Sequence, residues 1–397
     1  MNLKRKMKYK KYIILNFLHG NSPYLRTTEL AIAVNDLLEE KGMERMGIIV
    51  PWAYKLRQQK IMKRNFKDVI KKHPDEILLD ENLGMLLKDI FYDGHNYNDW
   101  LKFFLKNYKN TENKIQKYFT NGLTAQNFRS KKISIDRSQI EMEISRCSII
   151  DFKIKPSYYT SFAYYSDILE RSKSADAVKV EDNLLDEGAK YYHKIEADKT
   201  MRFIAEPATF SYMGNKPSRH KSEVFTPPNT NQKLRNPFLR FIRRGVYVTI
   251  TGVYGLNHLF DEMHKMHLSV YTHKTGFMPF SKRAPIDVIS HRNVLMHFAR
   301  VGWGSAWLSF NTETPLIALP YDSNDEPEVY FNNLSIEKLG IGKIYNGEHL
   351  NELLKFTEEY KKTVKSIKID LLKKYGTLDG VKYTAEKIVD HYLKSVV

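Results

Sequence analysis

A short apolar strand, a polar loop, a helix and a second apolar strand open this chain, and the same order of elements returns near residue 246. In the first copy, residues 12–18 predict a buried strand, His19 begins the loop, residues 27–41 predict a helix, and residues 48–51 predict the second strand. Two strands joined through a helix run parallel in one sheet. This order therefore predicts an α/β fold.

The second copy begins with residues 246–250 as a strand, Thr251 and Gly252 as its turn, and residues 256–266 as a helix. Further short strands alternate with helical segments up to residue 319. The two copies share no sequence repeat, so the duplication is one of architecture. Each copy predicts a Rossmann-like half built on a parallel sheet.

A length of 397 residues with 42% apolar residues provides for two hydrophobic cores. Prolines and basic residues crowd residues 214–244, which we interpret as a linker because proline breaks both helix and sheet. We therefore expect an N-terminal domain over 1–235, whose insertion includes a charged, helical segment over about 60–132. A C-terminal domain follows over 236–380, and a last helix over 381–397 could cross back to the first domain.

Lysine and arginine outnumber aspartate and glutamate by 63 to 46, which gives a net charge of +17. This excess favours anionic partners such as nucleotides, acidic lipid surfaces or nucleic acid. Cys147 is the only cysteine, which excludes an internal disulfide and fits a reducing cytosol. No run of about 18 uncharged apolar residues occurs, so we expect a cytoplasmic protein that could attach peripherally to the inner face of a membrane.

The most informative stretch covers residues 290–305 and ends in Arg300-Val301-Gly302-Trp303-Gly304-Ser305. A glycine-flanked turn that enters a helix leaves backbone N–H groups without helical partners, and the positive end of the helix dipole there favours a diphosphate. Arg300 adds a permanent charge whose planar fork suits phosphate oxygens. The alternative is that Gly302 and Gly304 only permit a tight turn from strand to helix.

This stretch resembles the donor-binding box of the nucleotide-sugar-dependent glycosyltransferases of the GT-B type, which include the UDP-glycosyltransferases. In that family a Ser-His pair is followed, at the same distance as here, by His-Cys-Gly-Trp-Asn-Ser. The resemblance covers about residues 246–345 and is faint in the N-terminal half. It implies a GT-B fold, in which two Rossmann-like parallel-sheet domains face each other across a cleft. The N-terminal domain would take the acceptor and the C-terminal domain the nucleotide-sugar donor.

The resemblance also implies the residues of the donor site. It assigns the nucleotide and diphosphate to Thr251, Gly252, Arg283, Arg300, Gly302, Trp303, Gly304 and Ser305, and the donor sugar to Asp325 and Glu326. Two positions depart from the family: Arg283 matches the tryptophan that stacks on the base, and Leu308 matches the glutamate that grips the ribose. A guanidinium can also stack on a base. A UDP-sugar therefore stays the first expectation for the co-substrate, and we expect neither a cofactor nor a metal.

His19 lies at the end of the first predicted strand, where the loop before a helix begins, and many inverting members of this family place their catalytic base there. Inversion needs a group that takes the proton of the acceptor hydroxyl while the diphosphate departs from the opposite face. A histidine suits that role because its unperturbed pKa is about 6.5. A strand-end histidine bonded to backbone is the alternative. Asp93, in preference to Asp99, is the expected acidic partner that would orient the ring.

We therefore expect an inverting, metal-independent hexosyltransferase that moves a sugar from a nucleoside-diphosphate sugar to a hydroxyl-bearing small molecule, glycan or lipid, with anionic and lipid-linked acceptors included. A nucleotide-sugar epimerase or hydrolase of the same fold is one alternative, but it would need carboxylates that face the sugar ring. A basic nucleic-acid-binding protein is another, although no helix-turn-helix, RNP-type sheet or zinc finger is evident. Nucleic acid is therefore not the expected partner.

Overall fold

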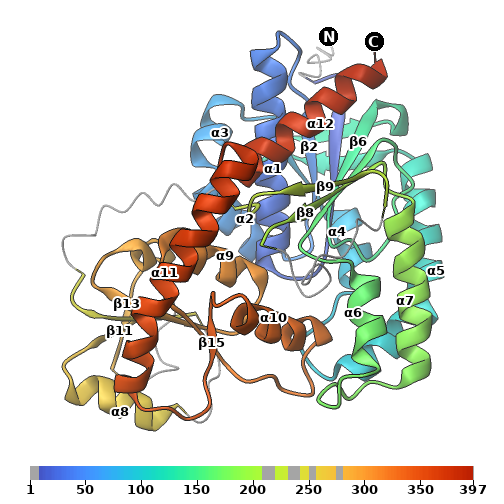
Figure 1. Ribbon diagram of the computed structural model, residues 1–397. Helices are drawn as coiled ribbons and strands as arrows, with labels where there is room; N and C mark the ends of the chain where they lie inside the picture. The colour runs from blue at the N-terminus through green and yellow to red at the C-terminus, as the bar shows by residue number, and fades with distance from the viewer. Residues whose placement is uncertain (1–8, 208–219, 231–241, 250–255, 274–279, 397) are drawn as a thin grey trace. The chain divides into compact units, whose positions relative to one another are not determined.

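The computed structural model describes residues 9–207, 220–230, 242–249, 256–273 and 280–396. Contacts within the chain divide it into two compact units, each with its own β-sheet (Figure 1). Unit 1 comprises Met1–Asn229 and Asp379–Val397, and unit 2 comprises Thr230–Leu378. The assignment of an acceptor role to one domain and a donor role to the other stays a prediction.

The sheet of unit 1 has nine strands in the order β5-β4-β3-β2-β1-β6-β7-β8-β9. Their bounds are β1 Tyr12–Phe17, β2 Gly47–Pro51, β3 Ile77–Asp80, β4 Leu123–Gln126, β5 Lys132–Ile135, β6 Ile140–Arg146, β7 Ser157–Ser161, β8 Met201–Ala205 and β9 Glu223–Thr226. Neighbouring strands run parallel except at β3–β4 and β4–β5, which are antiparallel. The predicted α/β class with a parallel sheet is confirmed, and the structure adds an antiparallel edge.

The helices of unit 1 lie between these strands along the chain, except α12, which follows unit 2. Their bounds are α1 Asn21–Glu40, α2 Lys55–Asn65, α3 Lys67–Lys72, α4 Glu81–Lys88, α5 Tyr97–Thr120, α6 Tyr165–Ser172, α7 Asp182–Ala197 and α12 Gly380–Val396. The predicted start of the first helix at residue 27 is wrong, because α1 begins at Asn21. Pro23 lies in its first turn, where a proline sacrifices no helical hydrogen bond. His19 is therefore two residues from the helix rather than at the start of a long loop.

Helix α12, at the C-terminal end of the chain, packs against α1 (Figure 1). Its apolar side chains share one core with Leu30 and Val34 of α1 and with the strands β1 and β2; these α12 residues are Val381, Ala385, Ile388, Val389 and Tyr392. Lys41 and Asp390 add an ion pair of 3.6 Å at the surface. The last segment of the sequence thus completes the core of the first sheet.

The sheet of unit 2 has six strands, all parallel, in the order β12-β11-β10-β13-β14-β15. The strands are β10 Gly245–Val248, β11 Ser269–Thr272, β12 Ser281–Arg283, β13 Val294–Ala299, β14 Leu316–Ala318 and β15 Lys343–Ile344, and the helices are α8 Asn257–Lys265, α9 Trp303–Thr312, α10 Pro327–Lys338 and α11 Leu350–Tyr375. Apolar residues of β10, β13, α8 and α11 form its core. The predicted second Rossmann-like sheet is confirmed.

Two expectations about connecting segments are wrong. The segment 60–132, predicted as helical, contains the strands β3 and β4. Each has only four residues, which is too short for a period-2 pattern to stand out between helices. The predicted linker contains strand β9, which pairs with β8 in the first sheet.

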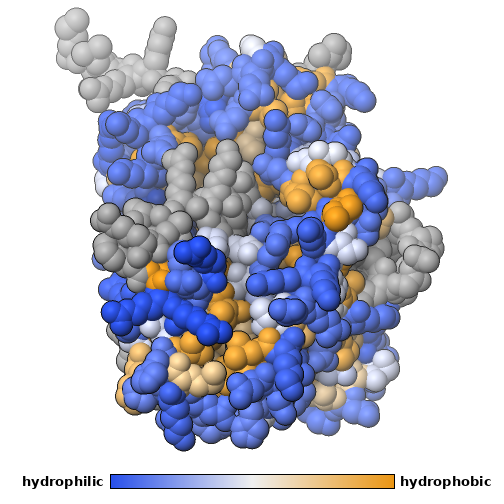
Figure 2. Space-filling view, turned by 60° about the vertical axis from the view of Figure 1, so that its left-hand side comes forward, coloured by the Kyte–Doolittle hydropathy of each residue, from blue (hydrophilic) through white to orange (hydrophobic). Residues whose placement is uncertain are grey.

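Hydrophilic side chains cover most of the face shown in Figure 2, and apolar side chains form scattered patches between them. Among the helices that the structure describes, none has both the length and the apolar character needed to cross a membrane.

Candidate functional site

The strand order reverses beside β1 in unit 1 and beside β10 in unit 2. Strand β1 lies between β2 and β6, and β10 lies between β11 and β13. In open parallel sheets, ligands bind outside the carboxyl ends of the strands at such reversals. His19 follows β1, Thr249 follows β10, and Arg300 follows β13. His19 and Arg300, both predicted from the sequence, therefore lie where the topology of their unit favours a ligand.

His19 lies in a short turn that contacts from several elements hold in place. Its half-buried ring meets Tyr92 edge-on, with ring centroids 5.4 Å apart. The backbone N–H of Gly20 donates to the hydroxyl of Tyr54 at 2.6 Å, and Gly20 has a φ of +100°, which favours glycine. The N–H of Leu18 donates to the carbonyl of Arg146 at 3.2 Å. The turn is thus fixed between the ends of β1, β2 and β6.

Asp93, the predicted partner of His19, is exposed, and its carboxylate accepts the backbone N–H of His95 at 2.9 Å. The ring that meets His19 belongs to the preceding residue, Tyr92, which is buried. The structure thus brings the Asp93 loop to His19 through Tyr92. Tyr92 and Tyr54 were not predicted as site residues, and the only signal in the sequence was the position of Tyr92 beside Asp93.

The carboxyl end of β6 adds the cationic residue Arg146 near the same turn, and helix α1 carries a second cation, Arg26. Arg146 ends β6 and is buried, and the Arg26 guanidinium lies 2.8 Å from the carboxylate of Glu29. Burial raises the pKa of Glu29, while Arg26 and Arg146 act in the opposite direction.

Cys147 is also buried, with its Sγ 3.1 Å from the hydroxyl of Ser161. Its surroundings are those of a packed core cysteine.

In unit 2, helix α9 begins directly after Gly302, and no side chain caps this end. Gly302 has a φ of −92°, which any residue can adopt, and a Cβ there would meet no atom within 4 Å. The tight-turn alternative therefore does not explain this glycine. Gly304 and Ser305 are half-buried in the first turn, whereas the Trp303 indole is buried against Trp307 at 4.4 Å. The buried indole of Trp303 cannot contact a ligand, so this residue can take part in a ligand site through its backbone only.

Arg300 and Asp325, predicted for the diphosphate and the sugar, form an ion pair with 2.7 Å between Nη2 and Oδ1. Arg300 is exposed, while Asp325 is largely buried. Burial raises the pKa of Asp325, and the neighbouring Arg300 counteracts that rise. The backbone carbonyl of Asp325 accepts the Tyr321 hydroxyl at 3.0 Å, and Glu326 forms the N-terminal cap position of α10. The acidic pair is thus anchored beside the cation.

His297 was not predicted as a site residue, yet it links the two strand ends of this site. It is fully buried, and its Nε2 lies 2.9 Å from the Thr249 hydroxyl while its Nδ1 lies 2.7 Å from the Ser309 hydroxyl. Burial lowers the pKa of His297 to about 3, so the ring is neutral at pH 7. A polar residue inside an otherwise apolar strand was the signal that could have identified it.

The remaining predicted donor residues lie around the same edge or outside the described part. Arg283 is the last residue of β12 and is exposed. Leu308 is buried in α9 among Val288 and other apolar side chains, so its side chain belongs to the core. Thr251 and Gly252 lie outside the described residues. In the described part of the chain, no group of three or more His, Cys, Asp or Glu side chains could hold a metal ion.

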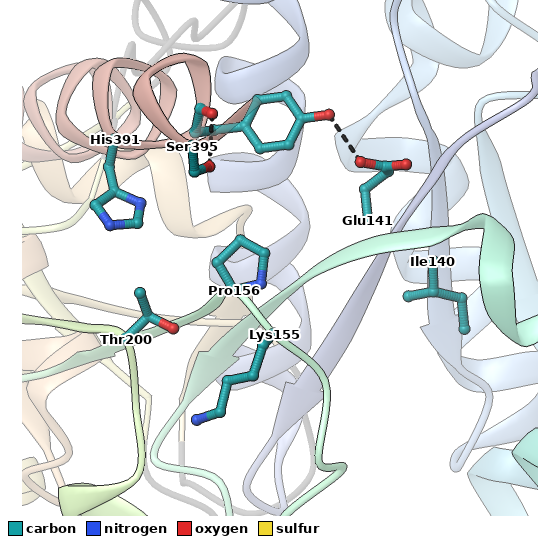
Figure 3. A pocket seen from close by; sticks show the side chains of 8 residues that line it. Ile140, Glu141, Lys155, Pro156, Thr200, His391 and Ser395 are labelled. Carbon is teal, nitrogen blue, oxygen red and sulfur yellow. Dashed lines mark hydrogen bonds between the residues drawn. The ribbon is translucent and has the colours of Figure 1, made fainter. Parts of the chain in front are cut away.

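A pocket of unit 1 lies at the edge formed by the amino ends of the strands, opposite the carboxyl edge that carries the candidate site (Figure 3). It is lined by Ile140, Glu141, Lys155, Pro156, Thr200, His391, Tyr392 and Ser395. Its charged groups are already engaged: Glu141 with Lys11 and with the Tyr392 hydroxyl, and Lys155 with Asp198. We assign no chemistry to it, and the reversal points at the carboxyl edges remain the candidate sites.

Comparison with solved structures gives matches over almost the whole chain. CalG4, the calicheamicin glycosyltransferase, matches with a TM-score of 0.54 and 13% identity, covering 98% of this chain and 100% of that chain. A UDP-glucose:anthocyanidin 3-O-glucosyltransferase in complex with UDP matches with a TM-score of 0.57 and 12% identity over 98% and 100% of the two chains. UGT71G1 of Medicago truncatula, complexed with UDP-glucose, matches with a TM-score of 0.57 and 13% identity, covering 97% of this chain and 98% of that chain.

No family model and no curated protein sequence matches the chain. At 12–13% identity these structures show the fold, and the nine- and six-stranded sheets agree with it. The chain therefore has the GT-B fold of the UDP-glycosyltransferase structures to which it is similar.

Proposed function

We propose that this chain is an inverting glycosyltransferase that moves a sugar from a nucleoside-diphosphate sugar to a hydroxyl-bearing acceptor. The observation that carries the proposal is the start of α9 at the carboxyl end of β13. There Gly302 leaves open space in front of a helix end without a side-chain cap, and Arg300 lies beside it. Helix N-termini favour phosphate through their N–H groups and dipole.

The donor would be held by groups that stabilise the departing diphosphate. Backbone N–H groups of the first turn of α9, the Ser305 hydroxyl and Arg300 supply this stabilisation without a required metal ion. Asp325 and Glu326 would take the hydroxyls of the donor sugar, and Thr251 and Gly252 would line the same site from the turn after β10. Two of the similar structures hold UDP or UDP-glucose, and a UDP-sugar is the proposed co-substrate, with Arg283 stacking on the base.

The proton of the acceptor would go to His19. Its place after β1, at a fixed turn against Tyr92, suits a base that must hold one orientation. Asp93 is the proposed acidic partner. The proposed acceptors are hydroxyl-bearing small molecules, glycans and lipids, with anionic ones included, because the chain as a whole carries a net charge of +17.

The test is to incubate the protein with a panel of nucleotide sugars in EDTA and to measure release of free nucleoside diphosphate, with and without acceptors. Release with at least one donor is expected, and its persistence in EDTA would support metal independence. The His19→Ala variant should lose transfer while it still binds the nucleotide. Absence of release from every donor, with nucleotide binding also absent, would contradict the proposal.

A further inference from the structure

Helices α2 and α3 carry strongly one-sided charge. Residues 55–72 contain eight lysines and arginines and a single acidic residue, Asp68, so they hold 7 of the 17 net positive charges of the chain. In α11, by comparison, seven lysines stand against four acidic residues. The excess in α2 and α3 therefore exceeds that of an ordinary solvated helix, in which both signs are interspersed.

All eight basic side chains are exposed. They are Lys55, Arg57, Lys60, Lys63, Arg64, Lys67, Lys71 and Lys72, which we call the basic surface. Within the described residues, Lys55 alone among them reaches a carboxylate, that of Glu81 at 3.9 Å. The charge of the basic surface is thus left almost entirely uncompensated by the protein itself.

Most basic residues of α2 lie on the side of the helix opposite its buried residues. Gln58 and Met62, one turn apart, are the buried residues of the helix. At about 100° per residue, Arg57, Lys60 and Arg64 project to the opposite side. Leu56 lies on that side too and is 64% exposed. The outer face of α2 therefore combines several cations with one apolar side chain in solvent.

We propose that the basic surface docks this protein on anionic phospholipid membranes. Clusters of four to eight lysines and arginines on an amphipathic helix match the negative potential of an acidic leaflet, and an exposed leucine can enter the interface. Single-stranded nucleic acid is the competing polyanion, but its proteins use exposed aromatic rings for base stacking. Phe66 is the only aromatic residue between Lys55 and Lys72, and it is partly buried. These features favour lipid.

Docking would also place the proposed base near the bilayer. Tyr54, which directly precedes α2, accepts the N–H of Gly20, the neighbour of His19. An acceptor presented at the membrane surface could then reach His19. This consequence rests on the proposed function, whereas the docking itself does not, because vesicle binding is measured without donor or acceptor.

The test is co-sedimentation of the full chain with phosphatidylcholine vesicles and with vesicles that contain phosphatidylserine, at low and at physiological salt. Binding only to the acidic vesicles, weakened by salt, is expected. Each basic residue near an acidic surface contributes about fivefold, so Lys60→Glu/Lys63→Glu/Arg64→Glu should weaken binding by roughly 100-fold or more. The control Lys361→Glu/Lys362→Glu/Lys365→Glu makes the same change in net charge on α11 and should bind nearly as the wild type does.

A Leu56→Trp variant gives a second measurement, because its fluorescence should shift to the blue when the ring enters acidic vesicles. Equal losses in the two triple variants would show that only net charge matters and would overturn the proposal. Equal binding to both kinds of vesicle would also overturn it. The proposal would also be overturned if an RNA bound through Lys60, Lys63 and Arg64 while acidic vesicles did not bind the protein.

Discussion

The guanidinium of Arg300 lies 2.7 Å from the carboxylate of Asp325, so the residue proposed for the diphosphate and the residue proposed for the donor sugar form an ion pair. Arg300 is 43% exposed, and a pair this open to water adds little to stability. Its effect is positional, because the cation is kept beside the start of α9 before any ligand arrives. A bound diphosphate would share Arg300 with Asp325.

Replacing Arg300 with alanine should weaken binding of UDP by roughly tenfold or more, since a hydrogen bond to a charged group contributes about 1.5–3 kcal/mol. Isothermal titration calorimetry measures this without any acceptor. Arg292→Ala is the matched control, because Arg292 is also exposed and lies just before β13. Equal affinities of the two variants would remove Arg300 from the diphosphate site.

A side chain at Gly302 should affect the ligand rather than the fold. The backbone at Gly302 is in the extended region that valine prefers, and a Cβ there meets no atom within 4 Å. The Gly302→Val variant should therefore melt within a few degrees of the wild type while its affinity for UDP falls roughly tenfold or more, because the branched side chain fills the space in front of the helix end. Unchanged affinity would show that the phosphate lies elsewhere.

The pairing of His19 with Asp93 can be tested against Asp99, the other acidic residue considered for this role. If Asp93 orients the imidazole, Asp93→Asn should lower kcat by roughly 100-fold and leave KM for the donor unchanged. Asp99→Asn should retain activity, since Asp99 is exposed in the first turn of α5. If Asp93→Asn behaves like Asp99→Asn, the ring is oriented by its packing against Tyr92.

The sequence allowed prediction of the elements whose signals are local. Strands β1 and β10 are apolar runs, and the glycine-flanked turn at Gly302 indicates the helix that follows it. The contacts that fix the sites are not local and could not be predicted. Tyr54 reaches Gly20 across 34 residues, and His297 reaches Thr249 across 48. Such pairs depend on which strands become neighbours, and strand order is not encoded in any single window.

Acid should destabilise unit 2 through His297. The folded protein keeps this ring neutral, with a pKa of about 3, whereas an unfolded histidine takes up a proton below about 6.5. The unfolded state therefore binds more protons between these values, and stability falls by up to about 1.4 kcal/mol per pH unit as the pH drops from 6.5 towards 3. Above pH 6.5 the contribution is complete.

Chemical denaturation of the wild type and of His297→Gln at pH 7.5 and at pH 5 measures this effect. The variant is expected to be less stable at pH 7.5, because Thr249 and Ser309 lose a well-placed partner. Its further loss on acidification should be smaller than that of the wild type by about 2 kcal/mol. Parallel losses in the two proteins would mean that other groups govern the acid response.

The last helix should be essential to the stability of unit 1 although it lies at the end of the chain. Ile388 is fully buried in the core that α12 shares with α1, and its truncation to alanine should cost about 2–5 kcal/mol through lost burial and the cavity left behind. Lys382→Ala, an exposed change on the same helix, should stay within about 0.5 kcal/mol. Denaturant unfolding of each variant, followed by tryptophan fluorescence, measures the loss, and Trp52 and Trp100 of unit 1 contribute to the signal. If Ile388→Ala and Lys382→Ala unfold alike, α12 does not support the first sheet.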